Sequence, residues 1–479
     1  MKIDLDKMTI AKAHDHLIKK DFSVRELCQA YLDEIEKRDK TVHAYLELYD
    51  DLDEQIEEAQ KMIDAGTDSV LAGIPLALKD NILVKGKKAS ASSKILENYT
   101  ATYDSTVATR LKEAGVVFLG RTNMDEFAMG SSTETSAYGV TRNPLDESRV
   151  PGGSSGGAAA SVAMHGALAS LGSDTAGSVR QPASFCGVVG LKTTYGSVSR
   201  YGLMAMGSSL DQIGPITRSV TDAEILFNTI RGHDAFDSTT LPNDLYKKMQ
   251  AQPLKSKKPV IGVPRDMVYI DGLDPEVRAN FDQSIKKLES LGYEIKDIEL
   301  PHIKYSLPAY YIIMPGEVSS NLARFDGVKF GLHVDGKNLL EDYKKTRGKG
   351  FGKEVRRRIL VGTHVLSSGY YDAYYNKAQN ARKLIIDDFT KAFEKVDVII
   401  TPTTPTPAFK LGEKKDNPVE MYLADIFTVP ANIARIPALS VPSGFVKKDG
   451  VDLPLGLQFM SAECREDILF AVGKEFLNE

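Results

Sequence analysis

The chain has 479 residues, of which 42% are hydrophobic and 26% charged, the proportions of an ordinary soluble globular protein. Its formal net charge of −5 argues against a protein that binds nucleic acid over its whole surface. No apolar run reaches the roughly 18 residues of a membrane-spanning helix, and residues 1–12 lack the apolar segment of a secretory signal. The cysteines Cys28, Cys186 and Cys464 are widely spaced, which excludes a disulfide framework and the common zinc patterns and favours a reducing cytoplasm.

Residues 1–65 are predicted to form a helical segment. Residues 23–26 read Ser-Val-Arg-Glu, a capping box in which the serine and glutamate side chains satisfy free N–H groups where a helix starts. A second, polar helix is expected over about 51–65, with Gly66 ending it. These helices could cover a core or dock a partner, and the pattern leaves both open.

Residues of about 72–220 are predicted to form the core of an α/β fold. The apolar run Ile74–Leu78 is typical of a strand that is buried on both faces. A helix over 105–115 and a strand over 116–119 are expected next. Residues 130–220 are rich in Gly, Ser, Ala and Thr, as a low-complexity linker would be. We nevertheless expect a folded segment, because several runs within it need burial, at 158–163, 167–171 and 188–191.

The C-terminal half continues the alternation of strands and helices. The expected strands lie at 260–263, 293–300, 396–400, 439–442 and 455–460, and the expected helices at 274–291, at 378–393 and from about Arg465 onward. Alternating strands and helices predict an α/β fold with a mostly buried sheet. The polar residues Lys344–Gly352 are expected to form a mobile loop.

Lys79 follows the first buried strand directly, and two interpretations are open. The ordinary one is a lysine that extends its amine from the strand end, paired with Asp80. The alternative is a lysine desolvated by Leu76–Leu78. Burial disfavours the charged form and lowers the pKa of a lysine, so such a residue could act as a base near neutral pH.

The segment Gly152–Gly157 reads Gly-Gly-Ser-Ser-Gly-Gly. A phosphate-binding loop would suit the glycines, but no Gly-Lys-Ser/Thr completes it. The segment also matches Gly-x-Ser-x-Gly, yet a nucleophile elbow needs a preceding strand, and residues 146–151 are charged and end in proline. None of the eight histidines lies in a triad partner motif, so a Ser-His-Asp hydrolase is disfavoured.

The segment Gly172–Pro182 contains a glycine at 177 that leads into a helix turn at Ser178. Backbone N–H groups in such a turn can point into one concavity and stabilise a developing oxyanion. A serine nucleophile there would need a base, and Lys79 acting through a second serine hydroxyl is chemically sensible. An ordinary glycine turn is the alternative.

Together the three segments resemble the amidase signature family, whose members use a Ser–cis-Ser–Lys triad. The two serine segments are separated by the family's spacing, with 24 positions from Ser154 to Ser178, and the match continues through residues 185–187 and 190–192. The resemblance implies one large domain over 1–479 with a mixed central β-sheet covered by helices on both faces.

The resemblance also implies a role for each residue of the triad. Ser178 would be the nucleophile, Ser154 the bridging hydroxyl after a cis peptide bond, and Lys79 the base. The implied oxyanion hole consists of the backbone N–H groups of four consecutive residues, Thr175, Ala176, Gly177 and Ser178.

Longer motifs, at 199–203, 208–215, 321–327 and 352–358, resemble one subfamily, the A subunits of bacterial aspartyl/glutamyl-tRNA amidotransferases. This resemblance implies a glutaminase that supplies ammonia for converting Glu-tRNA(Gln), Asp-tRNA(Asn) or both to the amidated forms. It implies B and C subunits as partners, with ATP, Mg²⁺ and misacylated tRNA bound mainly by the B subunit. It implies no cofactor in this chain and no membrane partner.

The same resemblance implies a pocket for free glutamine at Gly130, Ser131, Tyr310, Arg358 and Asp425. Arg358 can bind a carboxylate through two hydrogen bonds, and Asp425 can accept from an ammonium. Because residues 344–358 include eight Lys or Arg, Arg358 could instead belong to a basic surface for tRNA phosphate. We favour the pocket for Arg358 alone and the surface for the other basic residues.

Two positions depart from the family pattern, and two rival functions remain. Ala176 stands where glycine is usual, which would be strained at a positive φ. Arg435 stands where a small residue is usual, which would alter packing near the pocket or contacts with a partner. A stand-alone amidase acting on a small amide would lack the Arg358 and Asp425 pair. A non-catalytic scaffold would lack one of the three triad residues.

Overall fold

The computed structural model describes residues 3–414 and 417–479, and within them eleven strands form one mixed sheet. The order across the sheet is β1-β3-β2-β4-β6-β5-β10-β11-β9-β7-β8. The strands are β1 (Tyr45–Leu48), β2 (Pro75–Lys79), β3 (Val117–Thr122), β4 (Ala169–Asp174), β5 (Val189–Lys192), β6 (Gln212–Thr217), β7 (Ile261–Val263), β8 (Ile295–Asp297), β9 (Val398–Pro402), β10 (Ala438–Lys448) and β11 (Val451–Ser461).

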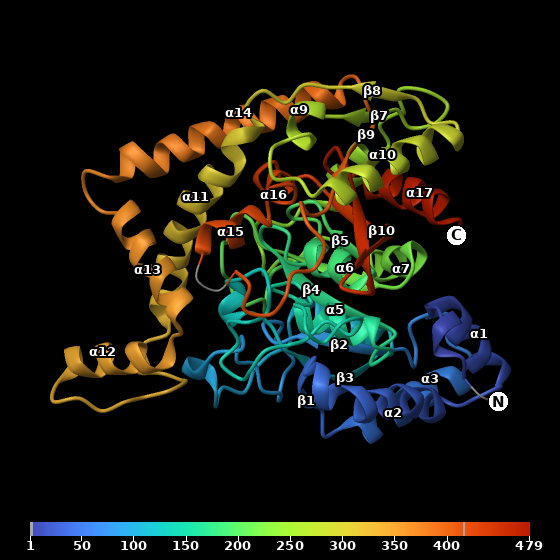
Figure 1. Cartoon of the computed structure of the whole chain (residues 1–479). Coiled ribbons are helices and arrows are strands. Elements are labelled where there is room, and N and C mark those ends of the chain that lie inside the picture. The colour runs from blue at the N-terminus through green and yellow to red at the C-terminus, as the bar shows by residue number, and fades with distance from the viewer. Residues whose placement is uncertain (1–2, 415–416) are drawn as a thin grey trace.

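Seventeen α-helices in the described residues flank this sheet on both faces, as the predicted fold class requires (Figure 1). They are α1 (Ile10–Lys19), α2 (Val24–Val42), α3 (Leu52–Asp64), α4 (Thr106–Glu113), α5 (Gly156–Ala163), α6 (Arg180–Cys186), α7 (Val220–Ile230), α8 (Asn243–Gln250), α9 (Arg265–Val268), α10 (Pro275–Ser290), α11 (Ser306–Asn321), α12 (Leu339–Gly350), α13 (Lys353–Val365), α14 (Lys377–Phe393), α15 (Pro418–Leu423), α16 (Val429–Ile433) and α17 (Glu466–Leu477).

The centre of the sheet brings the segment of Lys79 beside the start of the segment Gly172–Pro182. β2 lies between β3 and β4 and is parallel to both, and every residue of β2 is buried. A strand covered on both faces is expected to be a continuous apolar run, which is why the sequence pattern located it. Leu78 pairs with Leu171 of β4, so the carboxyl end of β2, where Lys79 stands, lies beside the end of β4.

Local sequence signals correctly located α2 and α3, but the segment 1–65 that was predicted to be helical also contains the strand β1. The Ser23 hydroxyl accepts from the Glu26 N–H at 3.2 Å, and the Glu26 carboxylate accepts from the Ser23 N–H at 2.7 Å, so the capping box at α2 is confirmed. The α3 helix ends at Asp64, two residues before Gly66, whose φ of 78° reverses the chain direction.

The prediction of a mobile loop at 344–352 is wrong, because residues up to Gly350 belong to α12. The Asn338 side chain caps this helix by accepting from the Glu341 N–H. Arg347 donates to the carbonyl oxygens of Leu322 and Phe325, and the Thr346 side chain is fully buried. Contacts with a distant segment therefore stabilise α12, although its composition is mostly polar. Helices α12 and α13 lie to one side of the sheet (orange, left in Figure 1).

The predicted C-terminal strands at 439–442 and 455–460 are confirmed but are longer than expected. β10 and β11 form an antiparallel hairpin of eleven residues each, in the middle of the sheet order. The hairpin extends past the buried part of the sheet, where Phe445 is 68% exposed, so burial alone could not reveal its length. No helix among the described residues is long and apolar enough to span a lipid bilayer.

Candidate active site

The amine of Lys79 is completely buried and lies among serine oxygens. Its Nζ is 2.7 Å from Ser154 Oγ, 2.8 Å from Ser155 Oγ and 2.9 Å from Ser173 Oγ. Burial lowers the pKa of Lys79 to about 7, although three buried aspartates, Asp125, Asp174 and Asp211, favour its charged form. The structure therefore excludes the interpretation of a solvent-exposed lysine: the amine is neutral in a large fraction of molecules near neutral pH.

Ser154 stands in a loop that several neighbours hold in place. The peptide bond between Gly153 and Ser154 is cis, as the resemblance implies. The Gln181 side chain accepts from the Gly153 N–H at 2.8 Å and donates to the Ser131 carbonyl at 2.8 Å. The Ser155 N–H donates to the Ser178 carbonyl at 3.1 Å. These bonds join the loops that carry Ser131, Ser154 and Ser178.

Ser178 is 7% exposed, and its Oγ forms no hydrogen bond with the described residues, so the hydroxyl is available to a ligand. Four backbone N–H groups around it were predicted to form an oxyanion hole. That of Gly177 already donates to Asp174 Oδ1 at 2.8 Å. Within residues 3–414 and 417–479, the N–H groups of Thr175, Ala176 and Ser178 have no acceptor. Three of the four groups are therefore free to bind an oxyanion.

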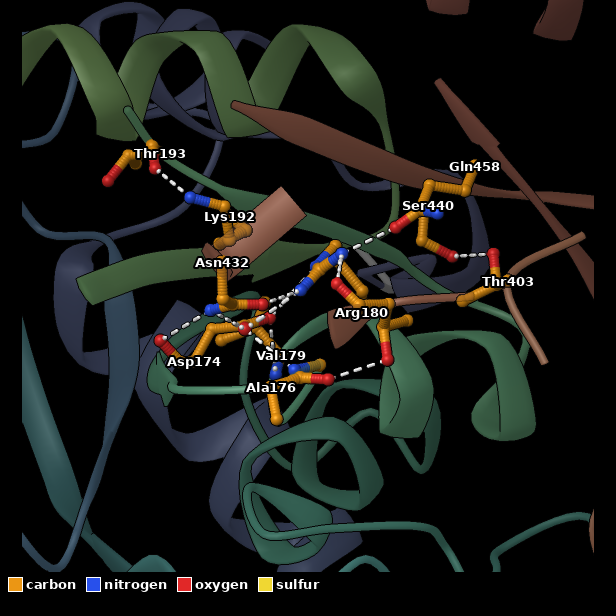
Figure 2. A network of polar contacts seen from close by, with 12 residues as sticks. Asp174, Ala176, Val179, Arg180, Lys192, Thr193, Thr403, Asn432, Ser440 and Gln458 are labelled. Atoms are coloured by element: carbon orange, nitrogen blue, oxygen red, sulfur yellow. Dashed lines mark hydrogen bonds and ion pairs between the residues drawn. The ribbon is translucent and has the colours of Figure 1, made fainter. Parts of the chain in front are cut away.

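A buried ion pair supports the turn that carries Ser178 (Figure 2). Arg180 donates to both oxygens of Asp174, each at 3.0 Å, and both side chains are completely inaccessible. Arg180 also contacts the side-chain oxygens of Asn432 and Gln458. Although burial opposes ionisation, Arg180 holds the pKa of the Asp174 carboxyl well below its ordinary value. The pair fixes the turn because Asp174 also accepts from the N–H of Val179.

The departure at Ala176 causes no backbone strain. Positive φ in this turn occurs at Gly177, where φ is 132°, and Ala176 is not among the residues with positive φ. A Cβ at Gly177 would overlap the Thr428 side chain, so glycine is required there instead. The Thr428 hydroxyl donates to the Ala176 carbonyl at 2.6 Å. The other departure, Arg435, is exposed, has a φ of 65° and lies over the Tyr195 ring.

Three of the five predicted pocket residues, Gly130, Ser131 and Arg358, line one cavity of about 670 Å³, whereas Tyr310 and Asp425 are not among the residues that line it. The Ser131 hydroxyl donates to Asp425 Oδ2 at 2.8 Å. Burial raises the pKa of Asp425 to about 7, and the bond from Ser131 opposes this shift. Thr428 connects the pocket to the turn of Ser178, because its hydroxyl also contacts the Asp425 carbonyl at 3.2 Å.

Arg358 is 6% exposed, which excludes a solvated basic surface for this residue. Its Nε donates to Glu354 Oε1 at 2.8 Å, and its guanidinium lies within 5.8 Å of the ring centroids of Tyr311 and Tyr422. Tyr310 is also buried and packs edge-on against Tyr311. Arg358 thus lines the cavity beside Tyr311 and Tyr422, and Tyr310 packs against Tyr311 without lining the cavity.

Three residues that the sequence patterns did not single out support this site: Asp174, Gln181 and Glu354. Asp174 and Gln181 fall inside the segment Gly172–Pro182, but no local rule assigns them a partner. Glu354 precedes Arg358 by four residues on one helix, a spacing that places both side chains on the same face. That spacing was a usable signal in the sequence.

The profile of the family described as Amidase matches residues 26–470. The chain belongs to the amidase family. This family member is 50% identical over 473 residues to the glutamyl-tRNA(Gln) amidotransferase A subunit of Desulfatibacillum aliphaticivorans, with 98% of this chain and 97% of that protein covered. It is 52% identical to the protein of the same name from Carboxydothermus hydrogenoformans, with 95% and 94% covered.

Solved structures resemble this amidase-family chain over its length. The glutamyl-tRNA(Gln) amidotransferase A subunit from Thermotoga maritima is 42% identical, with a TM-score of 0.79 and 99% and 95% of the two chains covered. A peptide amidase from Stenotrophomonas maltophilia is 28% identical, with a TM-score of 0.81 and 98% and 96% covered. The fold is therefore that of amidase-family enzymes, and the chain is an enzyme of the amidotransferase-subunit type.

Proposed function

We propose that this chain is the glutaminase subunit of a tRNA-dependent amidotransferase. In this proposal residues 1–479 act as one amidase domain, in which the helices of residues 1–65 pack on a signature core of about 72–220. The observation that carries the proposal is the buried Lys79 amine, which lies 2.7 Å from Ser154 Oγ and has a pKa near 7. A fully buried ammonium would be costly, whereas a neutral amine can accept a proton.

In the proposed reaction, Ser178 Oγ attacks the side-chain carbonyl carbon of glutamine. The Ser178 proton passes to Ser154 Oγ, whose own proton passes to Lys79 Nζ, and the oxyanion binds the free N–H groups of Thr175, Ala176 and Ser178. When the tetrahedral intermediate collapses, Lys79 returns the proton through Ser154 to the leaving nitrogen, which departs as ammonia. Water then cleaves the glutamyl ester by the same relay and releases glutamate.

Recognition of free glutamine needs both of its charged ends to be bound. Asp425 and Arg358 supply opposite charges beside one cavity, and Gly130, Ser131 and Tyr310 complete the proposed pocket. The name shared by the relatives supports a role in making Gln-tRNA(Gln) from Glu-tRNA(Gln). The ammonia would pass to a B subunit that activates the tRNA with ATP and Mg²⁺, with a C subunit completing the complex in the cytoplasm.

Replacing Ser178 by alanine tests the assignment of the nucleophile. Ser178→Ala removes one hydroxyl that makes no bond to the described residues, so we expect normal folding and no detectable release of ammonia from glutamine. In wild-type protein, rapid quenching followed by mass spectrometry should find a glutamyl ester on Ser178. An ester on Ser154 or Ser155 would contradict the assignment.

A stand-alone amidase is the alternative that purification distinguishes. The proposed subunit should co-purify with B and C subunits from its own cell, and the complex should amidate misacylated tRNA with glutamine as the donor. If the chain ran alone with full activity on small amides and did not bind such subunits, the amidotransferase proposal would be withdrawn.

A further inference from the structure

The carboxylate of Glu354 joins three side chains at the cavity. The proposed mechanism does not use this residue. Its Oε1 accepts from Arg358 Nε at 2.8 Å and from the Tyr422 hydroxyl at 3.1 Å. Its other oxygen pairs with the Arg357 guanidinium. Although burial opposes ionisation, Arg358 and Arg357 lower the pKa of the Glu354 carboxyl below its ordinary value, so Glu354 is an anion at neutral pH.

These contacts leave one edge of the Arg358 guanidinium without an oxygen partner. An arginine side chain carries five N–H donors in a planar fork, and Glu354 takes only the one on Nε. Nη1 makes a weak contact with the Met314 sulfur at 3.7 Å, and Nη2 has no partner among the residues that the structure describes. Arg358 lines the cavity, so its Nη1–Nη2 edge is the part available to an anion.

Two aromatic rings restrict the remaining freedom of Arg358. The rings of Tyr311 and Tyr422 stack with centroids 4.0 Å apart, and the guanidinium lies 5.8 Å and 5.7 Å from them. Cation–π attraction at this distance favours the position of the charge but fixes the rotation of the fork poorly. The hydrogen bond from Arg358 Nε to Glu354 fixes the orientation of the guanidinium plane. Tyr422 belongs to α15, so the same carboxylate connects α13 with α15.

We propose that Glu354 is a positioning residue that holds Arg358 by Nε, so that the Nη1–Nη2 edge binds the α-carboxylate of the free amino-acid substrate end-on. This inference rests on the proposed function, because it assigns Arg358 to glutamine. Glu354 also lines the cavity, but in this proposal it acts on the substrate only through Arg358. Its loss should therefore weaken binding through Arg358 and leave the Ser178 chemistry unchanged.

Glu354→Gln keeps the shape of the side chain but replaces a charge-assisted bond by a neutral one, which is about half as strong. For the assembled complex hydrolysing glutamine, we expect KM to rise about tenfold with little change in kcat. Glu57→Gln is the matched control, because Glu57 lies on the exposed face of α3 and away from the cavity. Tyr422→Phe removes only the hydroxyl and should raise KM about twofold to threefold.

A double-mutant cycle and a second substrate distinguish positioning from a general structural effect. In an Arg358→Ala background, Glu354→Gln should change KM no further, because the residue through which it acts is absent. The compound 4-aminobutanamide keeps the ammonium and the amide of glutamine but lacks its carboxylate. Its hydrolysis should be equally fast in wild type and Glu354→Gln.

The outcomes separate the two proposals. If the wild-type complex releases no ammonia from glutamine, or if Arg358→Ala leaves KM unchanged, the proposed function or its pocket fails. If Arg358→Ala raises KM but Glu354→Gln does not, or if the two effects add fully, the positioning role is overturned and the proposed function stands. An equal loss with 4-aminobutanamide would also overturn it. Should Glu354→Gln fail to assemble, Tyr422→Phe in the same cycle decides between the same outcomes.

Discussion

Lys79 shows how a single residue acquires its chemistry from its surroundings. The residues before it make a strand that is buried on both faces, so the amine at the strand end is removed from water. Burial lowers the pKa of Lys79 to about 7, while Asp125, Asp174 and Asp211 limit the shift. A lysine with its ordinary pKa of about 10.4 would be almost entirely charged at neutral pH and could not accept a proton.

The pH dependence of glutamine hydrolysis should follow from this shift. Lys79 is active when neutral, which is the form favoured above a pH of about 7, so kcat should fall about tenfold for each pH unit below that value. Asp425, whose pKa burial raises to about 7, must be ionised to bind an ammonium, so KM should rise over the same range. Ammonia release measured between about pH 5 and 9 gives both profiles. A kcat independent of pH below 7 would contradict the role of Lys79.

Lys79→Arg tests the base in a second way. Arginine keeps the positive charge but does not lose its proton, so we expect activity to fall by several orders of magnitude. Lys61→Arg, at an exposed position of α3, is the matched control and should retain wild-type activity. Glutaminase assays with both variants are sufficient. If Lys79→Arg kept more than a tenth of the wild-type kcat, Lys79 would be an electrostatic support and not the base.

At the scale of elements, the sequence predicts those parts of the fold that local rules decide. The capping box located α2, and the apolar run at 74–78 located β2, because both signals act within a few residues. The segment 344–352 was misassigned, because its helix depends on Arg347 reaching carbonyl groups of a segment about 25 residues away. The polar residues of such a helix indicate which face is exposed to solvent, but they do not indicate the contacts that stabilise the helix.

The proposed site depends on a different kind of evidence. Spacing alone does not bring Lys79 beside Ser173 at the end of β4; the parallel pairing of β2 with β4 does, and that pairing joins segments about 90 residues apart. The residues of the proposed triad are therefore assigned by resemblance to a family. The supporting contacts of Gln181 and Asp174 involve residues without a distinctive local pattern, and only the folded chain shows them.

The Asp174–Arg180 ion pair should be the element on which the catalytic turn depends. Asp174→Asn leaves the Arg180 charge buried without compensation, which typically costs about 3–5 kcal/mol of stability. It also replaces one carboxylate oxygen by an amide NH₂, which then faces a donor: the N–H of Gly177 in one orientation of the amide or the N–H of Val179 in the other. We expect a large fall in the free energy of unfolding, measured by denaturant titration, together with loss of glutaminase activity.

An exposed pair provides the comparison for this prediction. Arg265 and Asp297 are 2.7 Å apart, with both side chains about half exposed or more, so Asp297→Asn should change stability by less than about 1 kcal/mol. If Asp174→Asn were as mild as Asp297→Asn, the buried pair would not be what stabilises the turn.

At the scale of the whole molecule, the pocket is assembled from parts of the chain that lie far apart. Ser131 follows the third strand of the chain, Arg358 belongs to α13, and Asp425 precedes α16. Thr428 connects Asp425 to the turn of Ser178, and Gln181 connects Ser131 to the loop of Ser154. Under the proposed function, binding of glutamine and attack on its amide would both depend on these contacts, whereas use of free ammonia by a complex would bypass them.

This difference allows the pocket to be tested separately from assembly and tRNA binding. Loss of one charge-assisted contact in a buried site costs roughly 2–3 kcal/mol, which corresponds to about 30- to 150-fold. Arg358→Ala and Asp425→Ala should each reduce glutamine-dependent transamidation by the assembled complex by this factor, mainly through KM if the contact is equal in the ground and transition states. Transamidation with an ammonium salt should continue at the wild-type rate, because ammonia carries neither charged end of glutamine. The assay is run with each nitrogen donor on the same preparation, so that differences in assembly cancel. An equal fall with both donors would mean that Arg358 and Asp425 serve assembly or tRNA contact, and their assignment to the pocket would be wrong.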